Sequence, residues 1–177
     1  IINHGKLLAL GGLSVLVCTS LACGYKLAGK ADALPPTVNI IAIPAFENRT
    51  PWMRVEQKLT AAVMEEFVAR SRYRIVGRAD AGDAVLTGIV QAVDGAPVIF
   101  DPDTGRATHV LITVRVAVSL RDRHSQQVLY EQPQFVFREQ YEITSDLGSF
   151  FEERGPALDR LARDFAATLV SAILENF

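Results

Sequence analysis

The segment from His109 to Arg121 constrains the fold more than any other, because apolar and other side chains alternate along it. One set is Val110, Ile112, Val114, Val116, Val118 and Leu120, and the opposite set includes His109, Thr113, Arg115, Ser119 and Arg121. A period of two predicts a β-strand whose successive side chains point to opposite faces. One face of this strand should lie in the core, and the other should meet water or a partner.

Other segments predict further strands around this one. Residues 38–43 form a β-branched run of strand length that ends at Pro44, and Gly88 marks a possible bulge in the next strand. Pro133 interrupts the last strand, which fits an edge or a bulge better than a central position. The predicted strands are residues 38–43, 85–93, 109–121 and 127–143, with a short one at 73–76. Turn residues at 100–106 and 122–126 predict the connecting hairpins.

Two amphipathic helices complete the pattern. Thr50 is predicted to cap the first helix, with Pro51 in its first turn, and the helix runs for roughly 20 residues. The second helix is predicted over Pro156–Glu175, because Gly155 and Pro156 should break any helix begun before them. The apolar positions at helical spacing are Val55, Leu59, Ala62, Val63 and Phe67 in the first helix, and Leu158, Leu161, Phe165, Leu169 and Ile173 in the second.

The order of these elements is strand, helix, three strands and helix. A strand–helix–strand crossover followed by hairpins implies a mixed sheet with both helices on one face. The sequence therefore predicts an α+β fold, a two-layer sandwich of two α-helices on a mixed four-stranded β-sheet. The opposite sheet face, which carries Arg115 and Arg121, is left free to meet something else.

The N-terminal part has the features of an export signal. Lys6 precedes an apolar run of roughly 15 residues, which is shorter than the about 20 residues of a membrane-spanning helix. The run ends with the small residue Ala22 directly before Cys23. This arrangement is similar to the bacterial lipoprotein signal, in which the cysteine is acylated, although Ser20 stands where that signal usually has leucine. The alternative is an ordinary secretory signal with an incidental cysteine.

These features divide the chain into three parts: a lipoprotein signal peptide at residues 1–22, a lipidated tether at 23–37 and a single domain at 38–177. Gly24 after the lipid cysteine favours the outer membrane, with the domain facing the periplasm. No cysteine follows Cys23, so no disulfide can form within the domain. After residue 22 the chain has 17 basic residues (18 less Lys6) against 20 acidic ones, which argues against nucleic-acid binding.

The residues that usually carry catalysis are sparse. The part after Cys23 has two histidines, His109 and His124, too few for a zinc site of about three protein ligands. The sequence has no nucleophile elbow, phosphate loop or dinucleotide fingerprint. We therefore expect a binding protein rather than an enzyme, with neither a metal nor a cofactor.

Candidate binding residues fall into two groups. Arginine suits phosphate and carboxylate, so the hairpin and strand arginines Arg106, Arg115 and Arg121 are candidates for an anionic ligand. Their alternative role is to pair with acidic residues across the hairpins. Exposed aromatic or surplus apolar residues are candidates for contact with a partner protein, the alternative being the core. These are Trp52, Val170, Leu174 and Phe177.

Four segments together resemble a known family: CGYKLAG (23–29), LPPTVNIIAIPAFENRT (34–50), VLYEQPQFVFREQYEI (128–143) and the last 28 residues from Phe150. In this order they are similar to the LPS-assembly lipoprotein LptE family. The resemblance implies two helices on one side of a mixed sheet. It also implies a plug inside an LptD-like outer-membrane β-barrel, the lipopolysaccharide translocon, and contact with lipopolysaccharide through basic residues.

Two other functions stay open. The run IIAIPAFENRT also resembles the first strand and turn of secretion-related lipoproteins that assemble into rings or pores. In that case the domain would be a self-associating structural module. The third possibility is a lipoprotein of the outer membrane that binds an unrelated periplasmic ligand.

Overall fold

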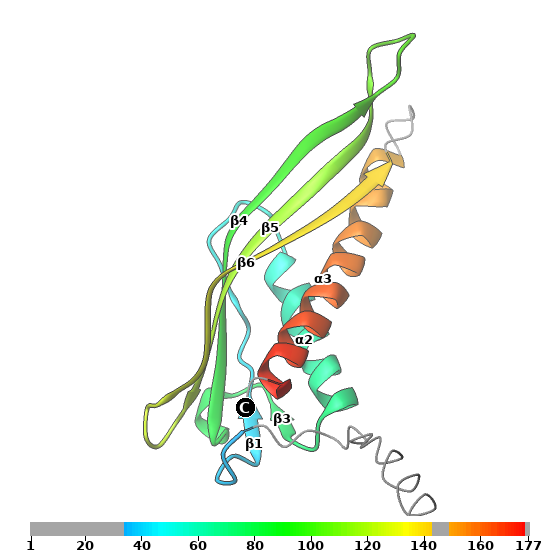
Figure 1. Cartoon of the computed structure of the whole chain (residues 1–177). Coiled ribbons are helices and arrows are strands. Elements are labelled where there is room, and N and C mark those ends of the chain that lie inside the picture. Colours follow the sequence, from blue (N-terminus) through cyan, green and yellow to red (C-terminus); the bar gives the residue numbers. More distant parts are fainter. Residues whose placement is uncertain (1–33, 143–148, 176–177) are drawn as a thin grey trace, which may run out of the picture.

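The computed structural model describes residues 34–142 and 149–175, and the side chains of the last helix from residue 155 onward. A sheet forms one layer and two helices form the other (Figure 1). This arrangement confirms the predicted α+β class. In chain order the elements are β1 (Ile40–Ala42), β2 (Glu47–Asn48), α2 (Val55–Arg70), β3 (Arg74–Val76), the 3-10 turn η2 (Ala79–Ala81), β4 (Ala84–Phe100), β5 (Ala107–Asp122), β6 (Val128–Glu142) and α3 (Ser149–Glu175).

Within the described residues the sheet has six strands, so the predicted number of four is wrong. The order is β3-β1-β4-β5-β6, and β2 pairs with β4. The pairs among β1, β2, β3 and β4 are parallel, whereas β4, β5 and β6 form antiparallel hairpins, which confirms a mixed sheet. The extra strands are β3, expected only as a short segment, and β2, whose two residues are too few to show periodicity.

The alternation along β5 is confirmed. Ile112, Val114, Val116 and Leu120 have no exposed surface and face the helices. Arg115 and Arg121 lie on the opposite side of the sheet, which we call the open face. Residues at even positions are thus in the core, and residues at odd positions are available for contact.

Both strands that flank β5 are irregular at the same height. In β4, Val90 pairs with Val116 and Ala92 with Arg115, so Gln91 has no partner in the ladder. In β6, Phe135 lies opposite Val116 and Gln132 opposite Val118, so Pro133 falls in the bulge between them. The prediction of an edge or a bulge at Pro133 is confirmed, since β6 is also an edge strand.

Gly88 marks a close contact and not a bulge, because it pairs in register with Val118. A Cβ atom at Gly88 would lie 2.5 Å from the ring of Phe46. The Phe46 ring is in turn packed edge-on against Phe165 of α3, with centroids 6.3 Å apart. Phe135 and Phe137 of β6 meet the same Phe165 ring edge-on, so this cluster holds the two layers together.

The first long helix starts later than predicted. Arg54 has φ 64°, a left-handed conformation, and α2 begins after it at Val55. Thr50 does not cap the helix, since its hydroxyl donates to the side chain of Asn48 and accepts from the N–H of Trp52. Because Thr50 bonds within its own segment and Arg54 is left-handed, residues 50–54 form a separate turn ahead of α2.

The last helix starts earlier than predicted. α3 runs from Ser149 to Glu175 and contains Pro156, so Gly155 and Pro156 do not end it. A proline removes one backbone hydrogen bond and crowds the preceding turn. Contacts of α3 with both α2 and β6 offset this local cost over a helix of 27 residues.

Candidate functional site

The three candidate arginines do not converge on one site. Arg115 and Arg121 share the open face, whereas Arg106 lies in the turn that joins β4 to β5. Nine residues separate Arg106 from Arg115, which corresponds to roughly 30 Å of strand. The alternation correctly predicted the shared face, but a single three-arginine cluster is absent from the described part of the chain.

Acidic neighbours engage two of these arginines. The guanidinium of Arg115 donates to Asp94 at 2.6 Å, and that of Arg121 lies 3.6 Å from Glu131. Arg106 has no carboxylate within ion-pair distance among the described residues. Cross-strand pairing, the alternative for these side chains, thus holds for Arg115 and Arg121, and their charge is balanced locally.

A small cleft lies on the open face between Arg115 and Arg121. It encloses about 230 Å³ and is lined by Thr87, Ile89, Gln91, Ala117, Val118, Ser119, Glu131 and Pro133. The Gln91 amide donates to the carbonyl of Pro133 at 3.3 Å, and the Thr87 hydroxyl donates to the carbonyl of Ser119 at 3.2 Å. The hydroxyl of Ser119 is buried, and no hydrogen-bond partner for it lies in the described part of the chain.

Sequence reasoning missed this cleft although part of its signal is visible. Ala117 and Ser119 are small residues at successive outward positions of β5, between two arginines. The remaining signal lies in the bulges at Gln91 and Pro133, which come from neighbouring strands. Only strand pairing places both bulges next to the same residue of β5, Val116.

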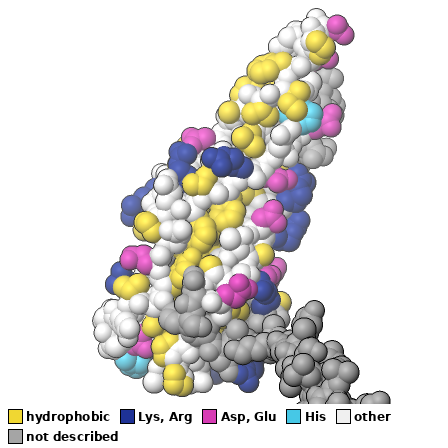
Figure 2. Space-filling model, viewed as in Figure 1, with side chains coloured by type: hydrophobic (Ala, Val, Ile, Leu, Met, Phe, Trp, Pro, Cys, Tyr) yellow, Lys and Arg dark blue, Asp and Glu magenta, His cyan; other side chains and the backbone are white. Residues whose placement is uncertain are grey.

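The β4–β5 hairpin extends beyond the helices and carries an apolar surface. Its outer part, residues 96–106, is called the hairpin tip here. Val98, Ile99 and Phe100 are exposed, the last by 54%. Figure 2 shows hydrophobic side chains gathered over this part of the molecule. An exposed apolar run next to Arg106 offers both a nonpolar and a cationic contact.

Trp52 lies where the helix layer ends and the hairpin continues. It is half-buried against the core, and it forms a hollow with Pro51, Met53 and Leu158. A Cβ atom at Gly95 of β4 would lie 3.9 Å from the indole ring, so the missing side chain leaves room there. Trp52 stays a candidate contact because its hollow opens to the surface.

The prediction that α3 offers a second apolar surface to a partner is wrong for two residues. Val170 is fully buried and Leu174 is only 5% exposed. α3 packs against both α2 and β6, and two contacts of this kind require two apolar stripes on one helix. Phe177, the third member of that group, lies outside the described residues.

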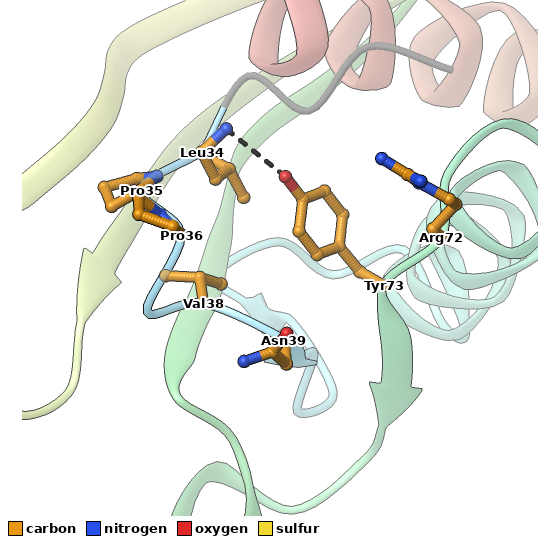
Figure 3. A pocket seen from close by; sticks show the side chains of 7 residues that line it. All are labelled: Leu34, Pro35, Pro36, Val38, Asn39, Arg72 and Tyr73. Carbon is orange, nitrogen blue, oxygen red and sulfur yellow. Dashed lines mark hydrogen bonds between the residues drawn. The ribbon is translucent and has the colours of Figure 1, made fainter. Parts of the chain in front are cut away.

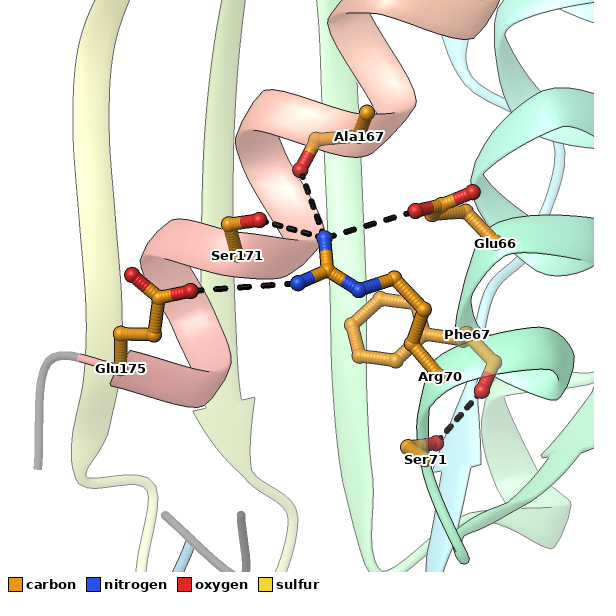
Figure 4. A network of polar contacts seen from close by, with 7 residues as sticks. All are labelled: Glu66, Phe67, Arg70, Ser71, Ala167, Ser171 and Glu175. Atoms are coloured by element: carbon orange, nitrogen blue, oxygen red, sulfur yellow. Dashed lines mark hydrogen bonds and ion pairs between the residues drawn. The ribbon is translucent and has the colours of Figure 1, made fainter. Parts of the chain in front are cut away.

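Ion pairs and hydrogen bonds fix the helices to one another and to the sheet. The guanidinium of Arg70 donates to the Ser171 hydroxyl and to the Ala167 carbonyl, and it lies 3.5 Å from Glu66 and 3.8 Å from Glu175 (Figure 4). Two further pairs join Lys58 to Asp159, and Arg160 to Glu139 of β6. The helix layer is therefore held at both ends.

The chain enters the described domain beside β3. The N–H of Leu34 donates to the Tyr73 hydroxyl at 3.3 Å, within a hollow of about 520 Å³ (Figure 3). Pro35, Pro36 and Val38 line one side of it, and Arg72 and Tyr73 line another. Residues 34–37, which the sequence assigns to the tether, thus contact the domain. Cys23, the predicted lipid site, lies outside the described residues.

One carboxylate ties this entry to the sheet. Oδ2 of Asp83 accepts the N–H groups of Asn39 and Ile40, both at 2.9 Å. These bonds hold the pKa of Asp83 below its ordinary value, because they favour the charged form. The start of β1 is therefore fixed by an ionised side chain 43 residues away in sequence from Ile40.

The described residues contain no group of three or more His, Cys, Asp or Glu placed to hold a metal ion. His109 Nδ1 lies 3.1 Å from the hydroxyl of Thr108, while His124 lies in the β5–β6 turn. Neither α2 nor α3 combines the length and apolarity needed to cross a membrane.

Comparisons with known proteins agree on family and fold. The LptE family model, described as Lipopolysaccharide-assembly, matches residues 38–173. The solution structure of uncharacterized lipoprotein B from Nitrosomonas europaea has a TM-score of 0.58 at 14% identity, covering 86% of this chain and 92% of that chain. The PelC dodecamer of Paraburkholderia phytofirmans gives 0.50 at 15% identity, covering 77% and 86%. At such identities the likeness shows the fold alone. No match was found among curated proteins.

Proposed function

Because this chain belongs to the LptE family of lipopolysaccharide-assembly proteins, we propose that it is an outer-membrane lipoprotein that plugs a β-barrel lipopolysaccharide translocon. In this role it assembles an LptD-like barrel and assists the insertion of lipopolysaccharide into the outer leaflet. The function is one of binding and assembly, without a catalytic step. The observation that carries the proposal is the family match over residues 38–173, together with the two-layer fold.

The geometry supports a plug in two ways. The lumen of a large barrel is polar, and the open face presents a mixture of neutral polar groups and balanced ion pairs. Arg70 joins α2 to α3 and Arg160 joins α3 to β6, so the two layers form one unit that could occupy a lumen. A lipid on Cys23 would keep the domain at the membrane, since several acyl chains bind far more firmly than one.

For lipopolysaccharide, the hairpin tip is the best-supported contact. Lipopolysaccharide combines anionic phosphates with acyl chains. Arg106 is without an acidic partner among the described residues, and Val98, Ile99 and Phe100 provide an exposed apolar surface near it. Arg115 and Arg121 stay weaker candidates because each lies beside a carboxylate.

The test of the plug is a pull-down of the full chain, tagged at its C-terminus, from detergent-solubilised outer membranes. Mass spectrometry should identify one large β-barrel in a 1:1 ratio with the tagged chain. A homo-oligomer without a barrel would instead support a ring-forming module, as PelC forms a dodecamer. Recovery of the tagged chain alone would favour a lipoprotein with a different ligand.

The lipid anchor is tested by Cys23→Ala, with Cys18→Ala as the matched control. The first variant should leave the membrane fraction and lose the mass of the acyl chains, whereas the control should behave as wild type. Membrane retention of Cys23→Ala would contradict the anchor at this residue.

The ligand contact is tested by Arg106→Glu against the double variant Arg115→Glu with Arg121→Glu. Binding of purified lipopolysaccharide should fall about tenfold or more for Arg106→Glu, since a charge-assisted bond is lost and a repulsion is introduced. The double variant should change binding less. If the wild type, Arg106→Glu and the folded double variant bind lipopolysaccharide equally, none of the three arginines belongs to the binding site.

A further inference from the structure

The cleft on the open face contains a buried hydroxyl that none of the described residues satisfies. Ser119 Oγ is buried and has no hydrogen-bond partner within residues 34–142 and 149–175, while its neighbours Thr87 and Gln91 already donate to carbonyl groups. An unpartnered buried polar atom destabilises a protein because its lost hydration is not replaced. Most buried polar groups are satisfied, so an exception on a surface cleft points to a group that arrives from outside.

The surrounding strands are shaped to leave this cleft open. The Gln91 bulge of β4 lies opposite the step between Arg115 and Val116, and the Pro133 bulge of β6 lies opposite Ala117, so both bulges adjoin Val116. The Gln91 side chain reaches across β5 to the carbonyl of Pro133. Bulges redirect side chains and are frequent beside functional sites. The volume of about 230 Å³ exceeds the roughly 30 Å³ of one water molecule.

The charges at the cleft select the kind of occupant. Arg121 lies beside Glu131, and Arg115 just beyond the cleft is bonded to Asp94. An anion would have to compete with these carboxylates, and a cation with the arginines. Besides Glu131, the cleft is lined by the hydroxyls of Thr87 and Ser119, the amide of Gln91 and apolar side chains. A neutral side chain that donates and accepts hydrogen bonds fits best.

We propose that this cleft is a docking point for the inner wall of the barrel partner, where it receives a neutral hydrogen-bonding side chain such as Asn, Gln, Ser or Thr. The barrel lumen is lined by polar side chains of this type. The inference rests on the proposed plug function and adds to it the face that contacts the wall and the chemistry of one contact. Ser119 is the group whose hydrogen bond forms only in the complex.

The experiment uses the full lipidated chain in complex with its barrel, and measures the half-life of the complex in detergent against excess untagged chain. Ser119→Ala should shorten the half-life about 3- to 10-fold, the effect of one lost hydrogen bond. Ala117→Leu fills the cleft and should shorten it further. Thr113→Ala and Thr113→Leu, on the same strand and face but outside the cleft, are the matched controls and should have smaller effects.

A second measurement separates docking from folding. Ser119→Ala should leave the melting temperature of the free chain unchanged or raise it, because no internal hydrogen bond is lost. Wild-type half-lives for Ser119→Ala and Ala117→Leu, or equal losses for the Thr113 controls, would overturn the cleft but leave the plug intact. A wild-type chain that recovers no barrel would overturn the plug and this inference together. Loss of lipopolysaccharide binding in Ala117→Leu with an unchanged half-life would assign the cleft to a sugar and overturn the protein contact.

Discussion

The two halves of the β4–β5 hairpin both carry large apolar side chains, but their surroundings differ. In the half beside the helices, Val90, Val114 and Val116 have no exposed surface. In the hairpin tip, Val98 and Phe100 are exposed although they too are large apolar residues in a strand. The difference comes from α2 and α3, which cover only the first half (Figure 1). Apolar residues in a strand therefore predict a surface that avoids water, but they do not show whether another part of the same chain packs on it.

The largest effect should come from removing an aromatic ring in the covered half. Phe165→Ala should lower the free energy of unfolding by about 3–5 kcal/mol, because three phenylalanines lose their shared contact and leave a cavity. Phe100→Ala in the hairpin tip should change it by less than about 0.5 kcal/mol. Urea denaturation of both variants measures the contrast. Similar losses would mean that the tip is packed in solution.

Two glycines of β4 should respond differently to the same added methyl group. Gly88→Ala should cost about 1–3 kcal/mol, because the new Cβ would collide with the Phe46 ring and that ring is held by Phe165. Gly95→Ala should be nearly neutral, since its nearest neighbours would lie 3.7 and 3.9 Å away. Thermal melting of both variants tests this. A neutral Gly88→Ala would show that Phe46 can move.

The stability effects of replacing two arginines, Arg70 and Arg106, should differ by a smaller amount. Arg70→Ala should lower the free energy of unfolding by about 1 kcal/mol, because hydrogen bonds between α2 and α3 are lost and the side chain is partly exposed. Arg106→Ala in the hairpin tip should leave it within about 0.5 kcal/mol of wild type. Chemical denaturation at low and high salt compares them, and only the Arg70 effect should shrink with salt. A salt-independent loss would point to packing of the side-chain stem.

The smallest expected effect is on the stability of the fold at acidic pH. Backbone N–H groups lower the pKa of Asp83 and of Asp101, where Thr104 is the main donor. A carboxyl whose folded pKa lies below its unfolded value of about 3.9 stabilises the fold above that pH, and the contribution is lost as pH falls through the folded pKa. Asp83→Asn should therefore flatten the acid dependence of unfolding below pH ~4.

Asp101→Asn should retain most of that acid dependence, because the bonds of Asp101 stay within its own turn whereas those of Asp83 join distant segments. Unfolding midpoints measured from pH 7 down to pH 3 distinguish the two variants. A flatter curve for Asp101→Asn than for Asp83→Asn would reverse the assignment.

The sequence predicted the parts that depend on local periodicity. The two faces of β5 follow from alternation, and the edge position of Pro133 follows from proline chemistry. The start of α2 could not be predicted, because it depends on the left-handed Arg54. The burial of Val170 depends on α3 contacting two elements at once, which a single helix pattern does not distinguish from a surplus surface.

The candidate site shows the same limit. The shared face of Arg115 and Arg121 was predictable from a period of two, but their carboxylate neighbours come from β4 and β6. The cleft depends on bulges in two different strands at matching heights. Pairing between strands, and not the pattern within one, creates both features.

The path of the chain also sets the distance between the N-terminal end of the domain and the hairpin tip. The described domain begins at Leu34 and α3 finishes near the same end of the molecule, while the hairpin tip lies at the opposite end (Figure 1). β4 alone has 17 residues, which corresponds to roughly 55 Å of extended strand. A chain held to a surface through its N-terminus can therefore touch a target on the order of 50 Å away without moving its base. Deleting two residues from each of β4 and β5 would shorten that arm by about 7 Å.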